Sequence, residues 1–136
     1  MIYIVTDKGY GKVIASEKTQ NINGELHVVN PIVALQVPFL PTTISFAISC
    51  SFFVNSNQRK FDIKLEVIDH TDYLLGALEG GVSADNSDSE NSTLSFDFSL
   101  SNVIFKNDGL HKVILYVEDE QVAEYSFTVF NQNIEI

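Results

Sequence analysis

The sequence predicts an all-β protein, a two-sheet antiparallel β-sandwich of Ig-like or C2-like type with seven to eight strands. Three segments alternate apolar and polar residues with a period of two, as half-buried strands require. The chain contains ten Phe and five Tyr but no Trp, and aromatic and β-branched residues suit the pleated surface of a sheet. Turn residues separate the alternating segments at short intervals, which is typical of a sandwich or barrel.

The N-terminal third is expected to contribute strands over residues 12–18 and 25–37, which are rich in β-branched residues. Asn23-Gly24 lies between these runs and predicts a tight hairpin, because both residues tolerate positive φ. Proline cannot donate to a ladder, so Pro31, Pro38 and Pro41 mark strand ends or edges. Residues 38–41 are therefore expected to carry the chain from one sheet to the other.

The central third carries the strongest alternation, over residues 43–52, 61–67 and 94–100. Between the second and third of these strands, residues 74–78 form the only plausible short helical turn, so we expect at most one. Residues 83–92 contain no apolar side chain beyond Ala84, which predicts an exposed, mobile loop.

The C-terminal part is expected to form a hairpin of residues 112–117 and 124–129, preceded by a turn at Asn107-Asp108-Gly109. The hairpin's own turn is expected near Asp119-Glu120. These two acids are poor residues for the positive φ angles of a tight turn, so a longer or bulged turn is predicted.

The length and net charge of the chain restrict its domain number and its binding partners. The 136 residues fit one domain, residues 1–136, and the single cysteine, Cys50, leaves no partner for an intrachain disulfide. A net charge of −10 disfavours binding to nucleic acid and to anionic membranes. The N-terminus lacks the pattern of a signal peptide and no stretch reaches the roughly 20 apolar residues of a membrane span, so we expect a cytoplasmic protein.

The acidic residues are unevenly placed. No Lys or Arg occurs between Leu65 and Phe105 or from Val113 onward, and both stretches contain several acids. The two stretches could be neighbours in space, and their simplest interpretation is a solvated surface that favours solubility.

Catalytic motifs are missing from the sequence. The histidines are His27, His70 and His111, and none lies in a recognisable nucleophile motif. His27 and His111 fall within strand patterns, where a hydrogen-bonded structural role is expected. The sequence therefore predicts a protein that is not an enzyme and has no organic cofactor.

A calcium site is the alternative function that the sequence supports. Asp69 and Asp72 follow a strand, and Asp85, Asp88 and Glu90 lie in the polar segment 83–92. If loops at one end of the sandwich meet, these carboxylates could supply the oxygen ligands that Ca²⁺ prefers. The spacing matches no EF-hand loop, and acidic loop tips are common for solubility alone.

Three structural motifs carry a resemblance to a known family: an Asn-Gly turn followed by residues 25–32, residues 38–42 leading into residues 45–48, and Gly109 before the closing hairpin. With these motifs, residues 12–129 resemble a family of small uncharacterised β-sandwich proteins of bacteria and their phages. The resemblance implies a fold and an origin in a mobile element, and it implies no activity or functional residue.

The leading functional hypothesis is a non-enzymatic module that acts through protein–protein contacts, in a bacterial or phage accessory system. An acidic face suits a basic partner surface, and complementary charge speeds such encounters. A sandwich also has edge strands, which can add a strand of another chain. Self-association into a homo-oligomer through an edge strand is therefore part of this hypothesis.

Overall fold

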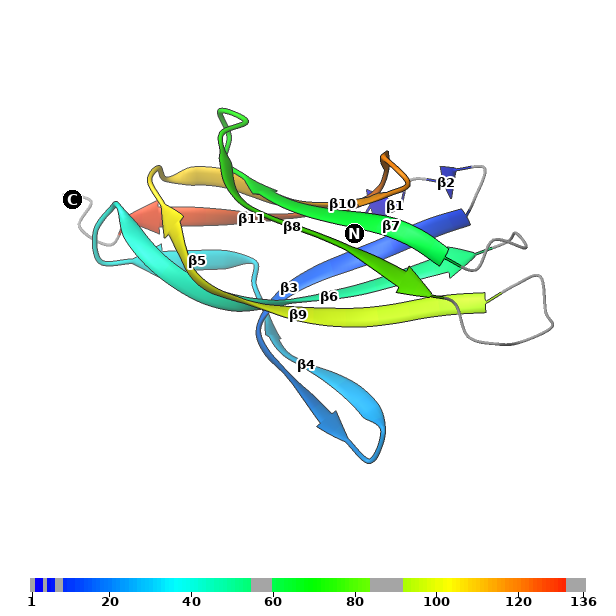
Figure 1. Cartoon of the computed structure of the whole chain (residues 1–136). Helices are drawn as coiled ribbons and strands as arrows, with labels where there is room; N and C mark the ends of the chain where they lie inside the picture. Colours follow the sequence, from blue (N-terminus) through cyan, green and yellow to red (C-terminus); the bar gives the residue numbers. More distant parts are fainter. Residues whose placement is uncertain (1, 4, 7–8, 55–59, 84–91, 132–136) are drawn as a thin grey trace.

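The protein is described by a computed structural model that covers residues 2–3, 5–6, 9–54, 60–83 and 92–131 (Figure 1). These residues form an all-β structure of two packed sheets, which confirms the predicted sandwich. The described residues include no helix of the length and apolar character that a membrane crossing requires.

The first sheet has the strand order β1-β11-β10-β7-β8, and β5 also pairs with β11. Its strands are β1 (Ile2–Tyr3), β5 (Ala34–Val37), β7 (Lys60–Ile68), β8 (Leu74–Ser83), β10 (Gly109–Val117) and β11 (Glu120–Asn131). The pairing of β5 with β11 is parallel, in contrast to the antiparallel pairing expected throughout, and the other pairs of this sheet are antiparallel.

The second sheet has the order β2-β3-β6-β9, and β4 pairs with β3. Its strands are β2 (Val5–Thr6), β3 (Gly9–Ile22), β4 (Glu25–Pro31), β6 (Thr42–Val54) and β9 (Ser92–Phe105). Among the described residues, nine strands have four or more residues, which exceeds the seven to eight predicted. One reason is that β4 and β5 are separate strands in different sheets, whereas the sequence pattern joined them as residues 25–37.

Four phenylalanines at the centre of the core hold the two sheets together. Phe52, Phe61, Phe105 and Phe127 are each at most 1 % exposed, and the Phe52 and Phe61 rings, from different sheets, meet edge to face at 5.8 Å. Full burial of such a side chain contributes about 1.5–3 kcal/mol relative to its exposure. The period-two alternation identified Phe52, Phe61 and Phe127, because it places every second side chain on the inner face, whereas Phe105 lies beyond the predicted segment 94–100.

The β3–β4 hairpin projects from the sandwich (Figure 1). The first part of β3 pairs with β6 as far as Ser16, and the remainder pairs with β4. Asn23 and Gly24 form the predicted turn with φ angles of 51° and 83°. The hairpin contacts the outer face of its sheet where the Thr19 hydroxyl donates to the Asp97 carboxylate at 3.1 Å.

Three connections of the described chain cross between the sheets. Residues 32–33 join β4 in the second sheet to β5 in the first, residues 38–41 join β5 to β6, and residues 106–108 join β9 to β10. The last two crossings agree with the turns predicted from Pro38, Pro41 and Asn107-Asp108-Gly109, and Gly109 has a φ of 102°.

Residues 74–78, where a short helical turn was plausible, form the first half of β8 instead, which agrees with the expectation of at most one such turn. The register of β8 places Leu78 opposite the buried Leu65 of β7, and Leu75 and Leu78 pack partly buried against the core, so pairing and packing decide the structure. Local propensity in this segment was weak, and tertiary pairing overrides it.

The longer or bulged turn predicted near Asp119-Glu120 is wrong, because β10 and β11 are joined by a tight two-residue turn. Val117 pairs with Glu120, and the intervening Glu118 and Asp119 have φ angles of 52° and 64°. The Glu118 amide donates to the Asp62 carbonyl at 2.8 Å, so a hydrogen bond to β7 helps to hold this conformation. A bulge does occur, but it lies in the ladder between Leu115 and Tyr116.

Candidate functional site

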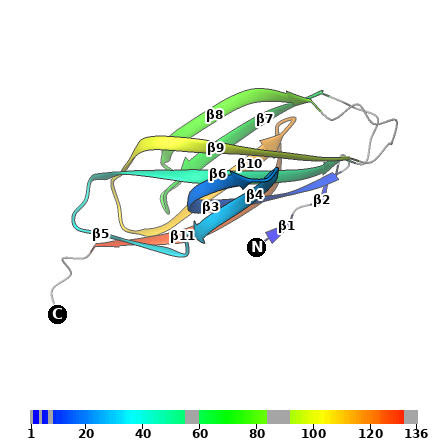
Figure 2. The same cartoon turned by 90° about the horizontal axis from the view of Figure 1, so that it is seen from below.

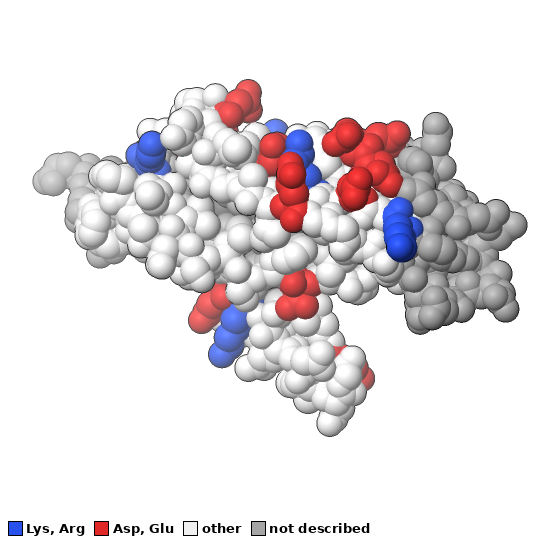
Figure 3. All heavy atoms as spheres, viewed as in Figure 1, with Lys and Arg blue, Asp and Glu red and all other residues white. Residues whose placement is uncertain are grey.

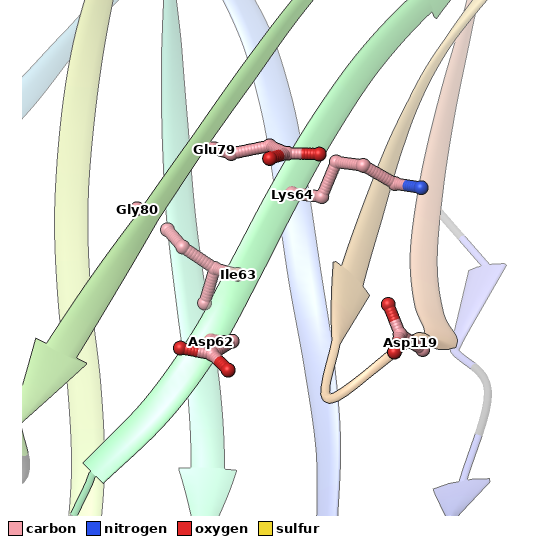
Figure 4. Close-up of a pocket in the computed structure, with 6 residues that line it drawn as sticks. All are labelled: Asp62, Ile63, Lys64, Glu79, Gly80 and Asp119. Atoms are coloured by element: carbon pink, nitrogen blue, oxygen red, sulfur yellow. The ribbon is translucent and has the colours of Figure 1, made fainter.

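A cavity of about 390 Å³ lies among charged side chains on the first sheet (Figure 4). Three structural elements line it: Asp62, Ile63 and Lys64 come from β7, Glu79 and Gly80 from β8, and Asp119 from the β10–β11 turn. The ladder places Lys64 directly opposite Glu79 and Ile63 opposite Gly80. The cavity therefore combines three carboxylates with one ammonium group at the β8 edge of the sheet.

Lys64 contacts a carboxylate on its own strand and an aromatic ring on β10. Its Nζ lies 3.8 Å from the Glu66 carboxylate and 4.7 Å from the centre of the Tyr116 ring. Burial raises the pKa of Tyr116, and the charge of Glu66 and its hydrogen bond with the hydroxyl raise it further. Lys64, the one lysine that lines the cavity, thus already contacts a carboxylate and a ring. Its positive charge therefore neutralises the negative charge of the cavity's carboxylates less than the charge of an isolated lysine would.

The two acid-rich stretches of the sequence meet on this face. Glu79 of the first stretch and Asp119 of the second line the same cavity. Figure 3 shows acidic side chains gathered near the turn that joins β10 and β11. The charge is not uniform, since Lys112 pairs with Glu124 at 3.6 Å on the same sheet.

Asp69, the first residue of the predicted calcium set, holds a turn together. It is 2 % exposed and accepts hydrogen bonds from the Thr71 amide, the Thr71 hydroxyl, the Tyr73 amide and the Asn107 side chain. Burial acts to raise the pKa of Asp69, but these hydrogen bonds outweigh it and leave the pKa well below its usual range. Oδ1 is therefore committed to the turn between β7 and β8, and Oδ2 to Asn107 in the connection between β9 and β10.

Among the other predicted ligands, Asp72 lies in the same turn, is exposed and has a φ of 65°. Asp85, Asp88 and Glu90 lie outside the described residues, and the flanking Ser83 pairs with Lys60 at the far end of β8. At about 3.3 Å per residue, the ten-residue β8 separates its two ends by roughly 30 Å.

The described part of the chain contains no group of three or more His, Cys, Asp or Glu side chains that could hold a metal ion. Three of the five predicted ligands lie outside the described residues, so the calcium site remains a prediction. The loop predicted at residues 83–92 likewise falls mainly outside the described residues, which include only Ser83 and Ser92 of it.

The histidines and the cysteine have mainly structural surroundings. His111 is fully buried between the rings of Phe105 and Phe127, at centroid distances of 5.1 and 5.8 Å, and its Nδ1 lies 2.9 Å from the Gly109 carbonyl. His27 is exposed on β4, in contrast to the structural role expected for it. Burial, with a smaller contribution from Asp97, raises the pKa of the Cys50 thiol, which makes it a poor nucleophile.

Two edge strands lie along one side of the sandwich. Among the described strands, β8 pairs with β7 alone and β9 with β6 alone, so each is the edge of its sheet. Figure 1 and Figure 2 show β8 and β9 on the same side of the molecule. On the opposite side, the backbone groups of β11 are paired more fully, because β1 and β5 both pair with β11 there.

Sequence reasoning missed the cavity and the identity of the β8 edge. The alternation of Asp62, Lys64 and Glu66 did indicate an outward-facing charged row on β7. Nothing in the local pattern indicates that Glu79 lies opposite Lys64, because that depends on residues 74–83 being a strand in register with β7.

Comparison with known protein families gives one match: the model of the family of unknown function DUF6941 matches residues 13–130. The chain belongs to that family, which confirms the predicted resemblance to an uncharacterised group. No curated protein matches the sequence.

Two similar solved structures show a distant likeness. An alkylpurine DNA glycosylase AlkC of Pseudomonas fluorescens is 10 % identical with a TM-score of 0.43, and the alignment covers 89 % of this chain and 30 % of that one. A β-glucosidase of Listeria innocua is 13 % identical with a TM-score of 0.47, covering 93 % and 17 %. The chain therefore spans less than a third of the length of these proteins.

Proposed function

From membership in a family of unknown function no activity follows, and we propose that the protein is a non-enzymatic module that binds another protein through the β8–β9 side of its sandwich. This proposal places it in the cytoplasm, in a bacterial or phage accessory system. Binding of nucleic acid or membrane is not part of the proposal, because the net charge of −10 opposes both.

The observation that carries the proposal is the pair of edges on one side. An edge strand presents a row of backbone amide and carbonyl groups that can pair with another chain. Here β8 has ten residues and β9 has fourteen, and both are longer than the usual strand of about five to six residues. Long edges offer many such groups, so strand addition is the mode of binding that the fold favours.

Self-association is one form of the same function. An edge of one copy could pair with an edge of a second copy and give a homo-oligomer. The low charge of β9, whose outer face carries mainly hydroxyls with Asp97, would permit this more readily than the acidic surroundings of β8. In either form the sheet edge supplies affinity, and the side chains beside it supply specificity.

Two measurements test the proposal. Sedimentation velocity over a wide concentration range reports self-association, and cross-linked capture from the native host followed by reconstitution with each purified candidate reports a partner. A defined oligomer or a reconstituted complex of fixed stoichiometry supports the proposal. A chain that stays monomeric and forms no complex with any purified candidate overturns it.

A further inference from the structure

The β8 edge has features that specify its partner more closely. We infer that β8 binds an extended segment of another protein in which apolar residues alternate with Lys or Arg. The inference rests on the proposed function, and it adds the edge, the mode of binding and the chemistry of the partner. The three observations behind it concern the glycines of β8, its unprotected edge and the carboxylates beside it.

The first observation is that β8 contains glycines that its own fold does not need. Nothing in the described residues lies within 4 Å of the position that a Cβ would take on Gly76 or Gly80, and neither residue has a positive φ. Glycine inside a strand costs roughly 0.5–1 kcal/mol relative to alanine. Glycine within a strand often marks a place where another backbone approaches closely.

The register shows on which face these glycines lie. Gly76 pairs with Val67 and Gly80 with Ile63, and both partners are buried in the core. Residues directly opposite each other share a face of the sheet, so the two glycines leave open space at the rim of the core. Apolar side chains of an added segment would fill that space.

The second observation is the lack of protection along this edge. Natural edge strands are usually blocked by Lys, by Pro or by inward-pointing charges. β8 contains no Lys and no Pro, and its one charged residue is Glu79. Glu79 lies opposite Lys64 on the outer face, so it does not block the approach of a strand to the backbone.

The third observation is charge. Glu79 lines the cavity with Asp62 and Asp119, and the cavity's one lysine, Lys64, is already in contact with Glu66 and Tyr116. A strand added to β8 would lie about 4.8 Å away, and its outward side chains would reach Glu79. Lys or Arg at those positions would complement the carboxylates.

A second copy of this chain fits the β8 edge poorly. Pairing β8 with β8 of a second copy would bring two sets of the Asp62, Glu79 and Asp119 carboxylates toward one another. Like charges opposed across strands destabilise their pairing. The net charge of −10 on each copy acts in the same direction. The occupant is therefore a basic segment of a different protein.

The probe that tests this is a synthetic peptide, acetyl-Val-Lys-Val-Lys-Val-Lys-Val-amide, added to the full chain labelled with ¹⁵N. We expect its binding to shift amide resonances along Leu74–Ser83 and to weaken as salt is raised. The same peptide with Glu in place of Lys is the charge control and is expected to produce no shift. Shifts of equal size with both peptides, or shifts confined to β4, β5 or β9, overturn the inference.

Gly80→Val tests the glycine argument, because it fills the space that the partner would use. The unfolding midpoint should rise by about 2–4 °C, since valine suits a strand and a Cβ at this position meets no described atom. Binding of the lysine peptide should weaken at least about 10-fold. Ala34→Val on the β5 edge is the matched control and should leave binding unchanged. Retained binding by folded Gly80→Val overturns the inference.

Failure of the inference is distinguishable from failure of the proposed function. A purified natural partner that binds wild type and Gly80→Val equally well leaves the proposed function standing and removes β8 as the binding edge. The absence of any partner or oligomer, as defined above, removes the proposed function itself.

Discussion

At the scale of single residues, Asp69 shows how one carboxylate can organise two connections. It accepts hydrogen bonds from Thr71 and Tyr73 in the β7–β8 turn and from Asn107 in the crossing between β9 and β10. Its side chain therefore ties the end of β7 to the connection that brings the chain back from the second sheet.

Asp69→Ala should lower the free energy of unfolding by about 2–4 kcal/mol, because it removes several hydrogen bonds to a charged acceptor. Asp69→Asn retains one oxygen and should cost less, but its amide would face the amide of Asn107. Urea unfolding of the three proteins at pH 7 measures the difference. Equal stability of wild type and Asp69→Ala would contradict this role.

His111 predicts a pH dependence of stability. Its Nε2 is buried without a hydrogen-bond partner among the described residues. Burial is the largest influence on the pKa of His111 and lowers it, and His70 lowers it further. The Gly109 carbonyl, Asp69 and Asp108 act in the opposite direction but do not outweigh burial. The folded protein thus favours the neutral imidazole, so its contribution to stability is present above the ordinary histidine pKa of about 6.5 and is lost as the pH falls through the lowered pKa.

Replacement of His111 by Leu should remove this loss of stability below about pH 6.5, because no imidazole then has to gain a proton on unfolding. Urea unfolding of wild type and variant at several pH values between 7.5 and 5 checks it. His27→Leu, at an exposed site on β4, is the control and should leave the slope unchanged. A slope that persists in His111→Leu would assign the pH dependence to other groups.

At the scale of elements, the β10–β11 turn departs from its residue preferences. Glu118 and Asp119 both adopt positive φ, a conformation that costs a non-glycine residue roughly 1–2 kcal/mol. The turn is imposed by its surroundings: the ladder of β10 with β11 closes on both sides, and the Glu118 amide bonds to Asp62.

The double replacement Glu118→Asn and Asp119→Gly should therefore stabilise the protein by about 1 kcal/mol, because Asn-Gly prefers this turn. Thermal or urea unfolding measures the gain. The reverse change is the matched control: Gly24→Ala, at a φ of 83° in the other tight turn, should destabilise the hairpin. A loss of stability in the double variant would show that the acidic side chains themselves contribute to the turn.

Comparison of these elements shows what the sequence could predict. Strands with one buried face, such as β6 and β7, follow from alternation, and the Asn23-Gly24 turn follows from its φ preferences. β8 and the β10–β11 turn do not, because their conformations depend on pairing with β7 and β11 rather than on their own residues. The residues of a segment alone do not indicate which strand it will pair with.

At the scale of the whole molecule, the sandwich is asymmetric. On one side, β1 and β5 both pair with β11. On the other, β8 and β9 are both edges and lie together (Figure 2). The sequence predicted that an edge strand could bind, but it could not say which one, since strand order arises only when the sheets assemble.

The candidate site shows the same limit. The sequence indicated that acids from two distant stretches could meet, and Glu79 and Asp119 do line one cavity. It placed the site instead at Asp69 and Asp72 with residues 85, 88 and 90, on the assumption that their loops share an end of the sandwich. The length of β8 separates Asp69 from Ser83, and local sequence patterns do not predict this distance.

Hydrogen–deuterium exchange of the free chain and of its complex with a purified natural partner tests the central claim most directly. In the free protein, the amides of β8 should exchange faster than those of β10, which has a neighbour on both sides. In the complex, protection should increase along β8. Protection that appears at β4 or β5 while β8 is unchanged would contradict the account.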